Sequence, residues 1–295
     1  MHKAGFVSIV GKPNAGKSTL MNALVGERLA IITNKAQTTR HRIMGIISGE
    51  DFQIVYSDTP GIIQPKYELQ QNMMRFVQAS LADADLILWL VELGEKMDQE
   101  IKLIRNISKA KIPVLLVLNK IDLAKGTRLN DKLDYWQQQL KDTTVKQVIP
   151  VSALHHTNLD LLMAAILEHL PHHPPFFPKD SLTDKPERFF ASEIIREKIF
   201  KNYKKEVPYA CEVVVTEFKE EQDIIRMRAE IYVERNSQKG ILIGKQGSAL
   251  KKVGMEARLA MEQFFQKKVF LEQFVKVAPD WRKKKDKLKR FGYLQ

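Results

Sequence analysis

Four short strings in the first half of the chain occur in a fixed order, and they constrain its fold more than any other feature. GKPNAGKS spans Gly11–Ser18, DTPG begins at Asp58, NKID begins at Asn119 and VSA begins at Val151. Their order and spacing match the successive contacts that one kind of α/β domain makes with the phosphates, the magnesium ion and the base of a nucleotide. None of the strings is decisive alone, but together they predict a nucleotide-binding α/β domain.

The first string has the pattern of a phosphate-binding P-loop. An apolar run at Phe6–Val10 precedes it and a helical pattern begins near Lys17, which is the strand, loop and helix context that such a loop requires. Glycines let the backbone N–H groups turn inward, and the helix dipole favours anions there. We expect Lys17 to reach the β- and γ-phosphates and Ser18 to ligate Mg²⁺. Taken alone, the string could also be an empty glycine-rich turn. The predicted nucleotide-binding residues of this loop are Gly11, Lys12, Pro13, Asn14, Ala15, Gly16, Lys17, Ser18 and Thr19.

The second string follows the strand-like stretch Phe52–Ser57. Open α/β sheets bind ligands at the carboxyl ends of their strands, so Asp58 is well placed to support the magnesium ion. Gly61 offers a flexible backbone N–H to the γ-phosphate. The predicted nucleotide-binding residues here are Asp58, Thr59, Pro60, Gly61 and Ile62.

The third and fourth strings predict the choice of base. NKID follows a continuous apolar run at Val114–Leu118, which is typical of a strand buried on both faces. A carboxylate at Asp122 can accept hydrogen bonds from N1–H and the 2-amino group of guanine, whereas adenine offers no such donors. This chemistry favours GTP and GDP over ATP, although NKID in isolation could be a polar turn. The predicted base-contacting residues are Asn119, Lys120, Ile121, Asp122, Ser152 and Ala153.

Composition indicates two domains and a large anionic partner. The 295 residues suit two domains, each able to bury a core. The net charge of +12 implies a partner more extensive than a nucleotide. The single cysteine, Cys211, suits a reducing compartment. The longest apolar stretch, Ala84–Leu93, is too short to cross a bilayer, and the first strand follows Met1 without room for a signal peptide. We therefore expect a cytoplasmic protein. We also expect a monomer.

The chain divides at a proline-rich segment. Strands alternate with helical stretches up to residue 170, which predicts an α/β P-loop GTPase domain with a mostly parallel, doubly wound sheet over 1–170. Residues 171–186 contain repeated prolines and are expected to form a short, semi-rigid linker. His172 and His173 lack companions at metal-ligand spacing and are better read as part of that linker.

Residues 187–279 have the element order of an α+β, type II KH domain. Helical spacing at Ser192–Tyr203 is followed by strands at Cys211–Phe218 and Ile224–Val233, then two helices separated by a G-x-x-G, and a last strand at Val269–Val277. Two glycines three residues apart allow close approach to a sugar-phosphate backbone. GKQG alone could be a tight turn between helices, but in this order it favours RNA binding. The predicted RNA-binding residues are Ile243, Gly244, Lys245, Gln246, Gly247, Lys251 and Lys252.

Residues 280–295 form a basic tail with interleaved apolar residues, DWRKKKDKLKRFGYLQ. We expect an amphipathic helix in which Trp281, Arg282 and Lys284 contact single-stranded nucleic acid through base stacking and phosphates. An anionic membrane surface is the competing interpretation.

The whole chain resembles the bacterial Era family of GTPases. Besides the domain order, QTTRHR at Gln37–Arg42, SEIIREKI at Ser192–Ile199 and IGKQG at Ile243–Gly247 carry the resemblance. It implies a ribosome-assembly factor whose KH domain binds the 3′ end of 16S ribosomal RNA in the small subunit, with a peripheral association with the cytoplasmic face of the cell membrane. It also implies that Thr39 is the switch residue that closes on Mg²⁺ and the γ-phosphate, with Thr38 as the alternative.

The residue after DTPG bears on the rate of hydrolysis. Ile62 stands where many small GTPases have a glutamine that orients the attacking water, and no arginine finger is evident. We therefore expect slow GTP hydrolysis. Asn14 matches the asparagine with which potassium-dependent GTPases bind K⁺, so K⁺ stimulation is expected. The catalytic set is then Lys17, Thr39, Gly61 and Asn14. Two alternatives remain open: an RNA-binding module in which GTP only stabilises the fold, and a membrane-associated signalling GTPase.

Overall fold

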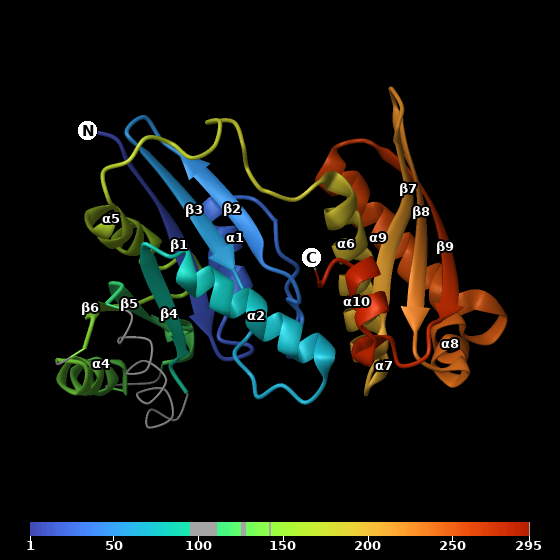
Figure 1. Cartoon of the computed structure of the whole chain (residues 1–295), viewed down its shortest axis with the longest axis horizontal. Helices are drawn as coiled ribbons and strands as arrows, with labels where there is room; N and C mark the ends of the chain where they lie inside the picture. The colour runs from blue at the N-terminus through green and yellow to red at the C-terminus, as the bar shows by residue number, and fades with distance from the viewer. Residues whose placement is uncertain (95–110, 125–127, 142, 295) are drawn as a thin grey trace. The chain divides into compact units, whose positions relative to one another are not determined.

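The computed structural model describes residues 1–94, 111–124, 128–141 and 143–294, and its contacts divide the chain into two units (Figure 1). The first comprises Met1–Ala30, Thr39–Gln64 and Met74–Asp184. The second comprises Ile31–Thr38, Pro65–Met73 and Lys185–Gln295.

The first unit is built on a six-stranded sheet in the order β2-β3-β1-β4-β5-β6. Only β2 is antiparallel to its neighbour, which confirms the predicted mostly parallel sheet. Every residue of β4 except the last is buried, as expected for a strand covered on both faces. The strands are β1 Lys3–Gly11, β2 Ile43–Ser48, β3 Phe52–Asp58, β4 Leu86–Glu92, β5 Val114–Asn119 and β6 Val145–Pro150.

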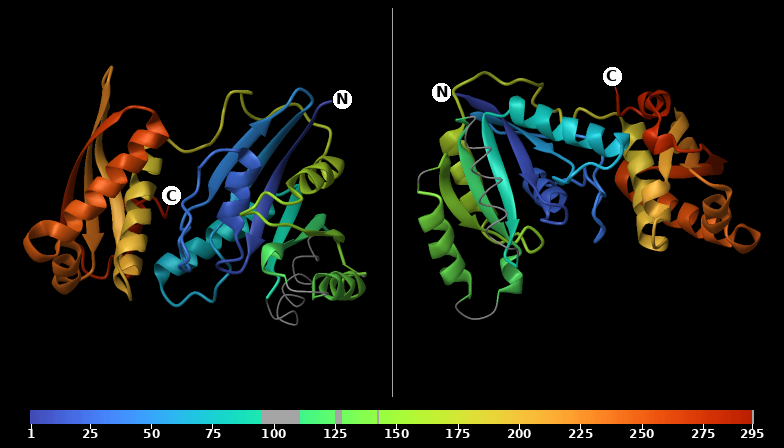
Figure 2. Two further views of the ribbon diagram at one scale, coloured as in Figure 1. Left: turned by 180° about the vertical axis from the view of Figure 1, so that it is seen from behind. Right: turned by 60° about the horizontal axis from the view of Figure 1, so that its bottom comes forward.

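Helices cover both faces of this sheet. Figures 1 and 2 show α2 on one face and α1 and α5 on the other, which is the doubly wound arrangement. Helix α1 ends at Gly26, whose φ of 82° is the left-handed conformation that glycine adopts most easily. The described helices are α1 Lys17–Val25, α2 Glu68–Ala82, η1 Ile121–Leu123, α4 Arg128–Gln139 and α5 Leu159–His169.

Most of the segment 171–186 is attached to the first unit. Its backbone forms isolated bridges with Lys3 and Gly45, at its two ends. Between them the buried side chain of Gln53 accepts hydrogen bonds from the backbone N–H groups of Phe176 and Phe177 and donates one to the carbonyl of Phe177. A buried amide that satisfies both its oxygen and its nitrogen in this way fixes the chain firmly. Most of the predicted linker segment is therefore bound to the first unit.

The second unit contains the predicted α-β-β-α-α-β order with one additional short helix, α7. Its sheet has the order β7-β8-β9, with β7 antiparallel and β9 parallel to β8. Buried residues of α6, α9 and β8 form one apolar core on a single face of the sheet. The elements are α6 Glu187–Asn202, α7 Val207–Ala210, β7 Glu212–Glu220, β8 Ile224–Val233, α8 Asn236–Ile243, η2 Lys245–Gly247, α9 Ser248–Phe265 and β9 Lys268–Val277.

The basic tail is folded into the second unit, which corrects the role predicted for Trp281. This side chain is fully buried, and its indole N–H donates to the carbonyl of Ala210 at 2.8 Å. The tail forms η3 Trp281–Lys283 and α10 Lys285–Arg290, and Leu288 is buried as well. Because burying a tryptophan removes a large apolar area from water, the side chain serves the core and cannot stack on a base in this conformation.

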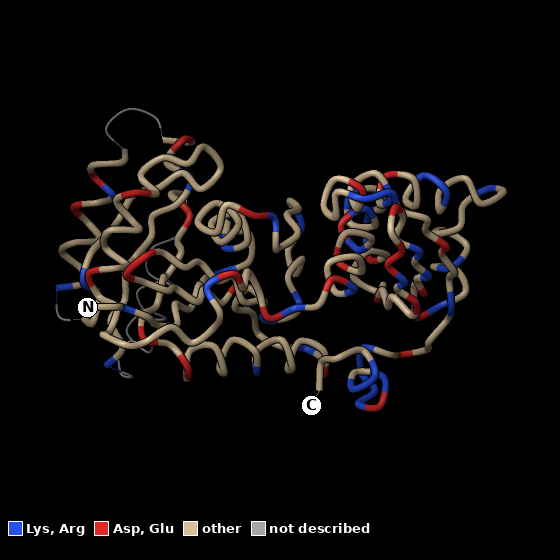
Figure 3. Tube along the Cα trace, turned by 90° about the horizontal axis from the view of Figure 1, so that it is seen from above, with Lys and Arg blue, Asp and Glu red and all other residues tan. Residues whose placement is uncertain are grey.

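Charged side chains of the tail remain at the surface. Lys283, Lys284, Lys285 and Lys289 are exposed, and Figure 3 shows basic residues gathered just before the C-terminus. Arg282 instead forms an ion pair with Glu234. Among the helices of the described residues, none has the length and apolarity needed to cross a bilayer.

Candidate nucleotide and RNA sites

The phosphate loop joins β1 to α1 as the sequence predicts. Gly16 has a φ of 98°, and a Cβ atom there would lie 2.3 Å from Nδ2 of Asn119, so both its conformation and its surroundings require glycine. The ammonium group of Lys17 donates to the carbonyl oxygens of Gly11 at 3.2 Å and Lys12 at 2.9 Å. Burial lowers the pKa of Lys17 to about 8, an effect that the nearby carboxylate of Asp58 opposes. Phosphate oxygens at this loop would replace the two carbonyls and restore a strong preference for the charged amine.

Three oxygen-bearing side chains meet beside this loop. The hydroxyl of Ser18 donates to Oδ2 of Asp58 at 2.6 Å and lies 2.9 Å from the hydroxyl of Thr39. Oδ1 of Asp58 is buried and has no hydrogen-bond partner among the described residues. Hard oxygen donors with an unsatisfied carboxylate oxygen fit Mg²⁺. The hydroxyl of Thr38 is engaged elsewhere, with the carbonyl of Lys35, so the geometry favours Thr39 as the switch threonine.

Magnesium binding should depend on pH through Asp58. Burial raises its pKa to about 6, although Ser18 and Lys17 oppose the shift. Mg²⁺ requires the ionised carboxylate, so the affinity for Mg²⁺ should fall about tenfold for each pH unit below 6 and should level off above pH 7. The measurement is a MgCl₂ titration of a fluorescent GTP analogue between pH 5 and 8.

The nucleotide's own phosphate also titrates in this range, so Asp58→Asn is the matched control. This variant should bind Mg²⁺ weakly and should retain only the pH dependence of the nucleotide. An identical pH profile for the variant and the wild type would contradict the role of Asp58.

Asn119 ties the phosphate loop to the base-binding strings. Its Nδ2 donates to the carbonyl of Ala15 at 2.8 Å, and its Oδ1 accepts from the backbone N–H of Ala153 at 3.1 Å. Ser152 donates to Oδ1 of Asp122 at 2.6 Å, which orients a carboxylate that is itself exposed. These three predicted segments therefore come together, and Asp122 is open to a base.

Lys120 has a partner that the motifs did not reveal. Its ammonium group lies 2.8 Å from Oε2 of Glu92, at the end of β4. Lys120 also has a φ of 64°, so this contact holds the side chain of a residue in an unusual conformation. The one available signal was position: Glu92 ends the strand next to the one that carries NKID.

The DTPG segment lies along the phosphate loop. The backbone N–H of Ile62 donates to the carbonyl of Gly11 at 3.1 Å, and the hydroxyl of Thr59 donates to that of Ile9 at 2.9 Å. A Cβ atom at Gly61 would lie 2.6 Å from the backbone nitrogen of Pro13. The side chain of Ile62 packs against the apolar cluster around Trp89, and its hydrocarbon cannot orient a water molecule.

The GKQG loop of the second unit has the backbone conformation expected of a close phosphate contact. Gly244 and Gly247 have φ values of 73° and 78°, and Gln246 has a φ of 51°. Lys245 and Gln246 are exposed between α8 and α9. The other predicted residues surround this turn, since Ile243 ends α8 and both Lys251 and Lys252 are exposed near the start of α9. Arg282, Lys284 and the buried Trp281 belong to the separate tail.

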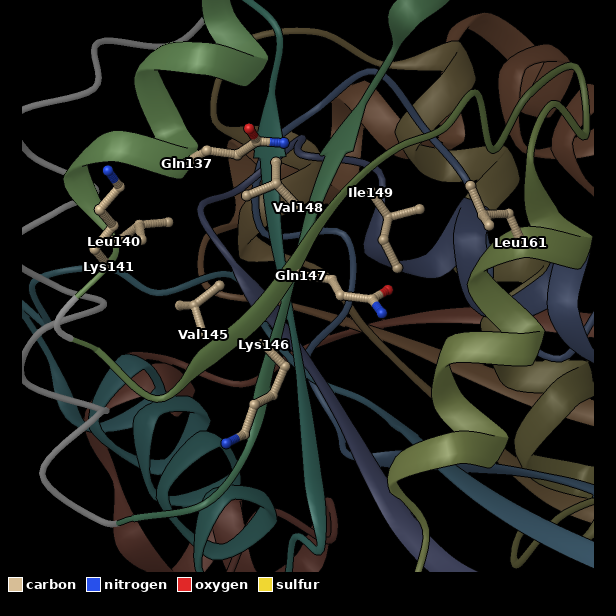
Figure 4. Close-up of a pocket in the computed structure, with 9 residues that line it drawn as sticks. All are labelled: Gln137, Leu140, Lys141, Val145, Lys146, Gln147, Val148, Ile149 and Leu161. Carbon is tan, nitrogen blue, oxygen red and sulfur yellow. The ribbon is translucent and has the colours of Figure 1, made fainter.

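A cavity of about 430 Å³ at the edge strand β6 is distinct from both sites (Figure 4). None of the predicted site residues lines it. The lining residues are Gln137, Leu140, Lys141, Val145, Lys146, Gln147, Val148, Ile149 and Leu161.

Two family models match successive parts of the chain. The model described as a 50S ribosome-binding GTPase matches residues 6–120, and the KH domain model matches residues 206–282. These matches agree with a GTPase domain followed by a KH domain.

Relatives match the chain over its length. GTPase Era of Ruminiclostridium cellulolyticum is 44% identical and covers 99% of this chain and 98% of its own. A chloroplastic ERA-like GTPase of Oryza sativa is also 44% identical, over 99% of this chain and 70% of its own.

A solved structure of Era in complex with MgGDPNP and nucleotides 1506–1542 of 16S ribosomal RNA has a TM-score of 0.93 and 38% identity, and all of both chains is covered. With relatives this similar along its whole length, the chain belongs to the Era family of GTPases.

Proposed function

We propose that this chain is a GTP-hydrolysing switch that binds the 3′ region of 16S ribosomal RNA and acts in assembly of the small ribosomal subunit. The observation that carries the proposal is the presence of two candidate sites in one chain. The first unit holds the phosphate loop, Asp58 and Asp122, and the second unit holds the exposed GKQG turn. The 38% identical Era that was solved with MgGDPNP and 16S ribosomal RNA nucleotides supports both halves.

Each nucleotide-binding residue has a distinct task in this proposal. Ser18, Thr39 and Asp58 would hold Mg²⁺, which when bound neutralises charge on the β- and γ-phosphates. Lys17 binds the same phosphates, and the backbone of Gly61 presents an N–H to the γ-phosphate. Asp122 accepts from guanine, oriented by Ser152. Because Ile62 offers no polar group to the attacking water, we propose a slow intrinsic rate.

A potassium ion is proposed to compensate for the lack of a polar group at Ile62. Asn14 is exposed on the phosphate loop with a φ of 64°, a position from which its amide oxygen can face a monovalent cation near the phosphates. GTP hydrolysis should therefore be faster in KCl than in NaCl at equal ionic strength. Asn14→Ala should abolish most of the difference. Equal wild-type rates in the two salts would exclude the potassium site.

Nucleotide and RNA binding are proposed to be coupled through the segments next to the switch residues. Ile31–Thr38 and Pro65–Met73 group with the KH elements in the second unit. There the buried guanidinium of Arg196, paired with Glu193 at 2.6 Å, donates to the carbonyl of Thr38. Thr38 directly precedes Thr39, so a movement of Thr39 toward Mg²⁺ and the γ-phosphate would pull on this bond.

The function is tested by titrating labelled RNA from the small-subunit 3′ end against the protein in GTP-analogue and GDP forms. Coupling of about 1 to 3 kcal/mol corresponds to a roughly 5- to 150-fold difference in affinity. The same RNA must change nucleotide affinity by the same factor. Identical affinities would refute the switch and leave an RNA-binding module with GTP as a structural ligand. Absence of RNA binding in both forms would refute the function.

The site of action is proposed to be the cytoplasm, where the RNA partner resides, with the protein as a monomer. A peripheral membrane contact would have to rely on the exposed lysines of the tail, because Leu288 and Phe291 are buried within the unit. Vesicle flotation with and without RNA separates a membrane-linked signalling GTPase from the proposed switch.

A further inference from the structure

The outer face of the β7-β8-β9 sheet carries two exposed aromatic rings. Helices α6 and α9 and the apolar core occupy the inner face. On β9, Phe270 and Phe274 are four residues apart and so point to the same side, with 47% and 40% of their surface exposed. Single exposed apolar residues are common, but two on one strand of a solvent-facing sheet form a surface.

Each ring is accompanied by an arginine from the neighbouring strand. The guanidinium of Arg226 lies 5.5 Å from the ring centre of Phe270, and that of Arg228 lies 4.6 Å from the ring centre of Phe274. Their carboxylate partners, Glu221 at 3.2 Å and Glu217 at 3.6 Å, are about half exposed. Exposed ion pairs of this kind contribute little to stability, so both arginines can leave their carboxylate partners and interact with a ligand.

The chain itself occupies one end of this face in the same manner. Tyr232, on the same side of β8, is only 6% exposed. Phe291 lies 5.0 Å from it between ring centres, and the guanidinium of Arg290 lies 5.6 Å from its ring centre. The C-terminal segment thus covers Tyr232 by stacking aromatic and guanidinium groups, and it leaves Phe270 and Phe274 uncovered.

We propose that Arg226, Arg228, Phe270 and Phe274 form a second RNA site, which stacks unpaired bases flanking the nucleotides held at GKQG. The proposal rests on the RNA-binding function proposed above. Aromatic and guanidinium planes are the surfaces on which proteins stack splayed-out bases.

Charge along the strand agrees with a single-stranded RNA. Lys268 and Lys276 stand exposed at the two ends of the same face of β9. Lys276 forms an ion pair with Glu230 of β8, and its side chain remains half exposed, so both lysines can meet phosphates. The exposed Glu272 lies between the two rings and disfavours a phosphate there, so bases rather than backbone are expected at the centre. An acidic partner protein would be repelled by Glu272 in the same way, and it would not gain the stacking energy that a base gains.

The position of the sheet and the length of the RNA also favour a second RNA site. Helices α8 and α9, which flank GKQG, pack on the inner face of the sheet, and β9 is an edge strand in contact with both of them, so RNA held at GKQG can reach the outer face by passing over the edge of β9. A GXXG loop clamps about four nucleotides. The RNA in the complex of the similar Era, nucleotides 1506–1542, is longer and extends beyond such a clamp.

The test uses the full-length protein with the substitutions Phe270→Ala and Phe274→Ala combined. Two single-stranded RNAs from the small-subunit 3′ end are compared, one of about four nucleotides and one of about twelve. Loss of two stacked bases should weaken the longer RNA by at least about thirtyfold and leave the shorter one unchanged. The matched control, Met255→Ala with Leu259→Ala, removes two apolar side chains that are 55% and 48% exposed on α9. It should bind both RNAs as the wild type does.

GTP hydrolysis and thermal unfolding establish that the variants are folded. Should the alanine pair fail to fold, Phe270→Leu with Phe274→Leu keeps the apolar volume and removes the aromatic planes. In the wild type, ultraviolet crosslinks from the longer RNA should map to Phe270 or Phe274. Wild-type affinity of the folded variant for the longer RNA, or equal weakening of both RNAs, would overturn the second site alone. Failure of the wild type to bind either RNA would overturn the proposed function as well.

Discussion

Asp122→Asn is expected to weaken GTP binding by one to several orders of magnitude and to improve the binding of xanthosine triphosphate. The carboxylate can accept two hydrogen bonds from guanine, and hydrogen bonds to a charged group are worth about 1.5 to 3 kcal/mol each. An amide would place an N–H₂ against the guanine donors, whereas xanthine has a carbonyl at that position. The Ser152 hydroxyl, 2.6 Å from Oδ1 of Asp122, can still orient the amide oxygen.

Competition between the two nucleotides, followed by calorimetry or by displacement of a fluorescent analogue, measures this change. Asp160→Asn on α5 is the matched control, since Asp160 is an exposed carboxylate of the same unit. It should leave both affinities unaltered. Unchanged GTP affinity in Asp122→Asn, without a gain for the xanthine nucleotide, would mean that another group reads the base.

Lys245→Asp combined with Gln246→Asp is expected to abolish RNA binding in both nucleotide forms. Both residues are exposed on the turn between Gly244 and Gly247, so the change places two carboxylates where phosphates are proposed to lie. Reversal of a phosphate contact should weaken RNA of any sequence and make the remaining binding less sensitive to salt. The affinity loss should exceed about a hundredfold at low salt.

Lys204→Asp with Gln263→Asp supplies the control, because both residues are exposed in the same unit and the net charge changes equally. Long-range electrostatic effects are then matched, and only the local contact differs. Nucleotide binding should be normal in both double variants. Undiminished RNA binding by the GKQG variant, or an equal loss in the control, would remove GKQG as the phosphate-contacting loop.

The arrangement of the nucleotide site was largely predictable because the residues of each motif that set the backbone conformation and supply the hydrogen-bonding groups are adjacent in the sequence. Gly16 and Lys17 are neighbours in sequence, and a parallel sheet brings the ends of β1, β3 and β5 to one edge. The choice between Thr38 and Thr39 was not predictable in this way. It depends on whether a hydroxyl faces Ser18 or Lys35, and hence on the path of a segment with no regular structure.

The motifs also did not reveal the contacts between residues that are far apart in the sequence. Glu92, at the end of β4, pairs with Lys120, which follows the neighbouring strand β5. Gln53 holds the backbone of Phe176 and Phe177, which lie more than a hundred residues away in the sequence. Neither residue belongs to a pattern, since any acceptor of suitable length at those positions would look the same in the sequence. The domain boundaries at 170, 186 and 279 stay predictions, although the contacts place 171–184 with the first unit.

The sequence by itself was enough to predict the chemistry of the two main sites: a phosphate loop, a magnesium-binding set, a guanine reader and a GKQG turn. These follow from a few adjacent residues whose conformation and hydrogen-bonding groups are local. Tertiary structure alone decided that Trp281 is buried against Ala210 and that Phe270 and Phe274 remain exposed. All three are aromatic residues in the same C-terminal stretch of the sequence. Their different fates arise because burial depends on which distant elements cover a side chain. Among the described residues of this unit, the tail covers Tyr232 at one end of the outer face and leaves Phe270 and Phe274 exposed.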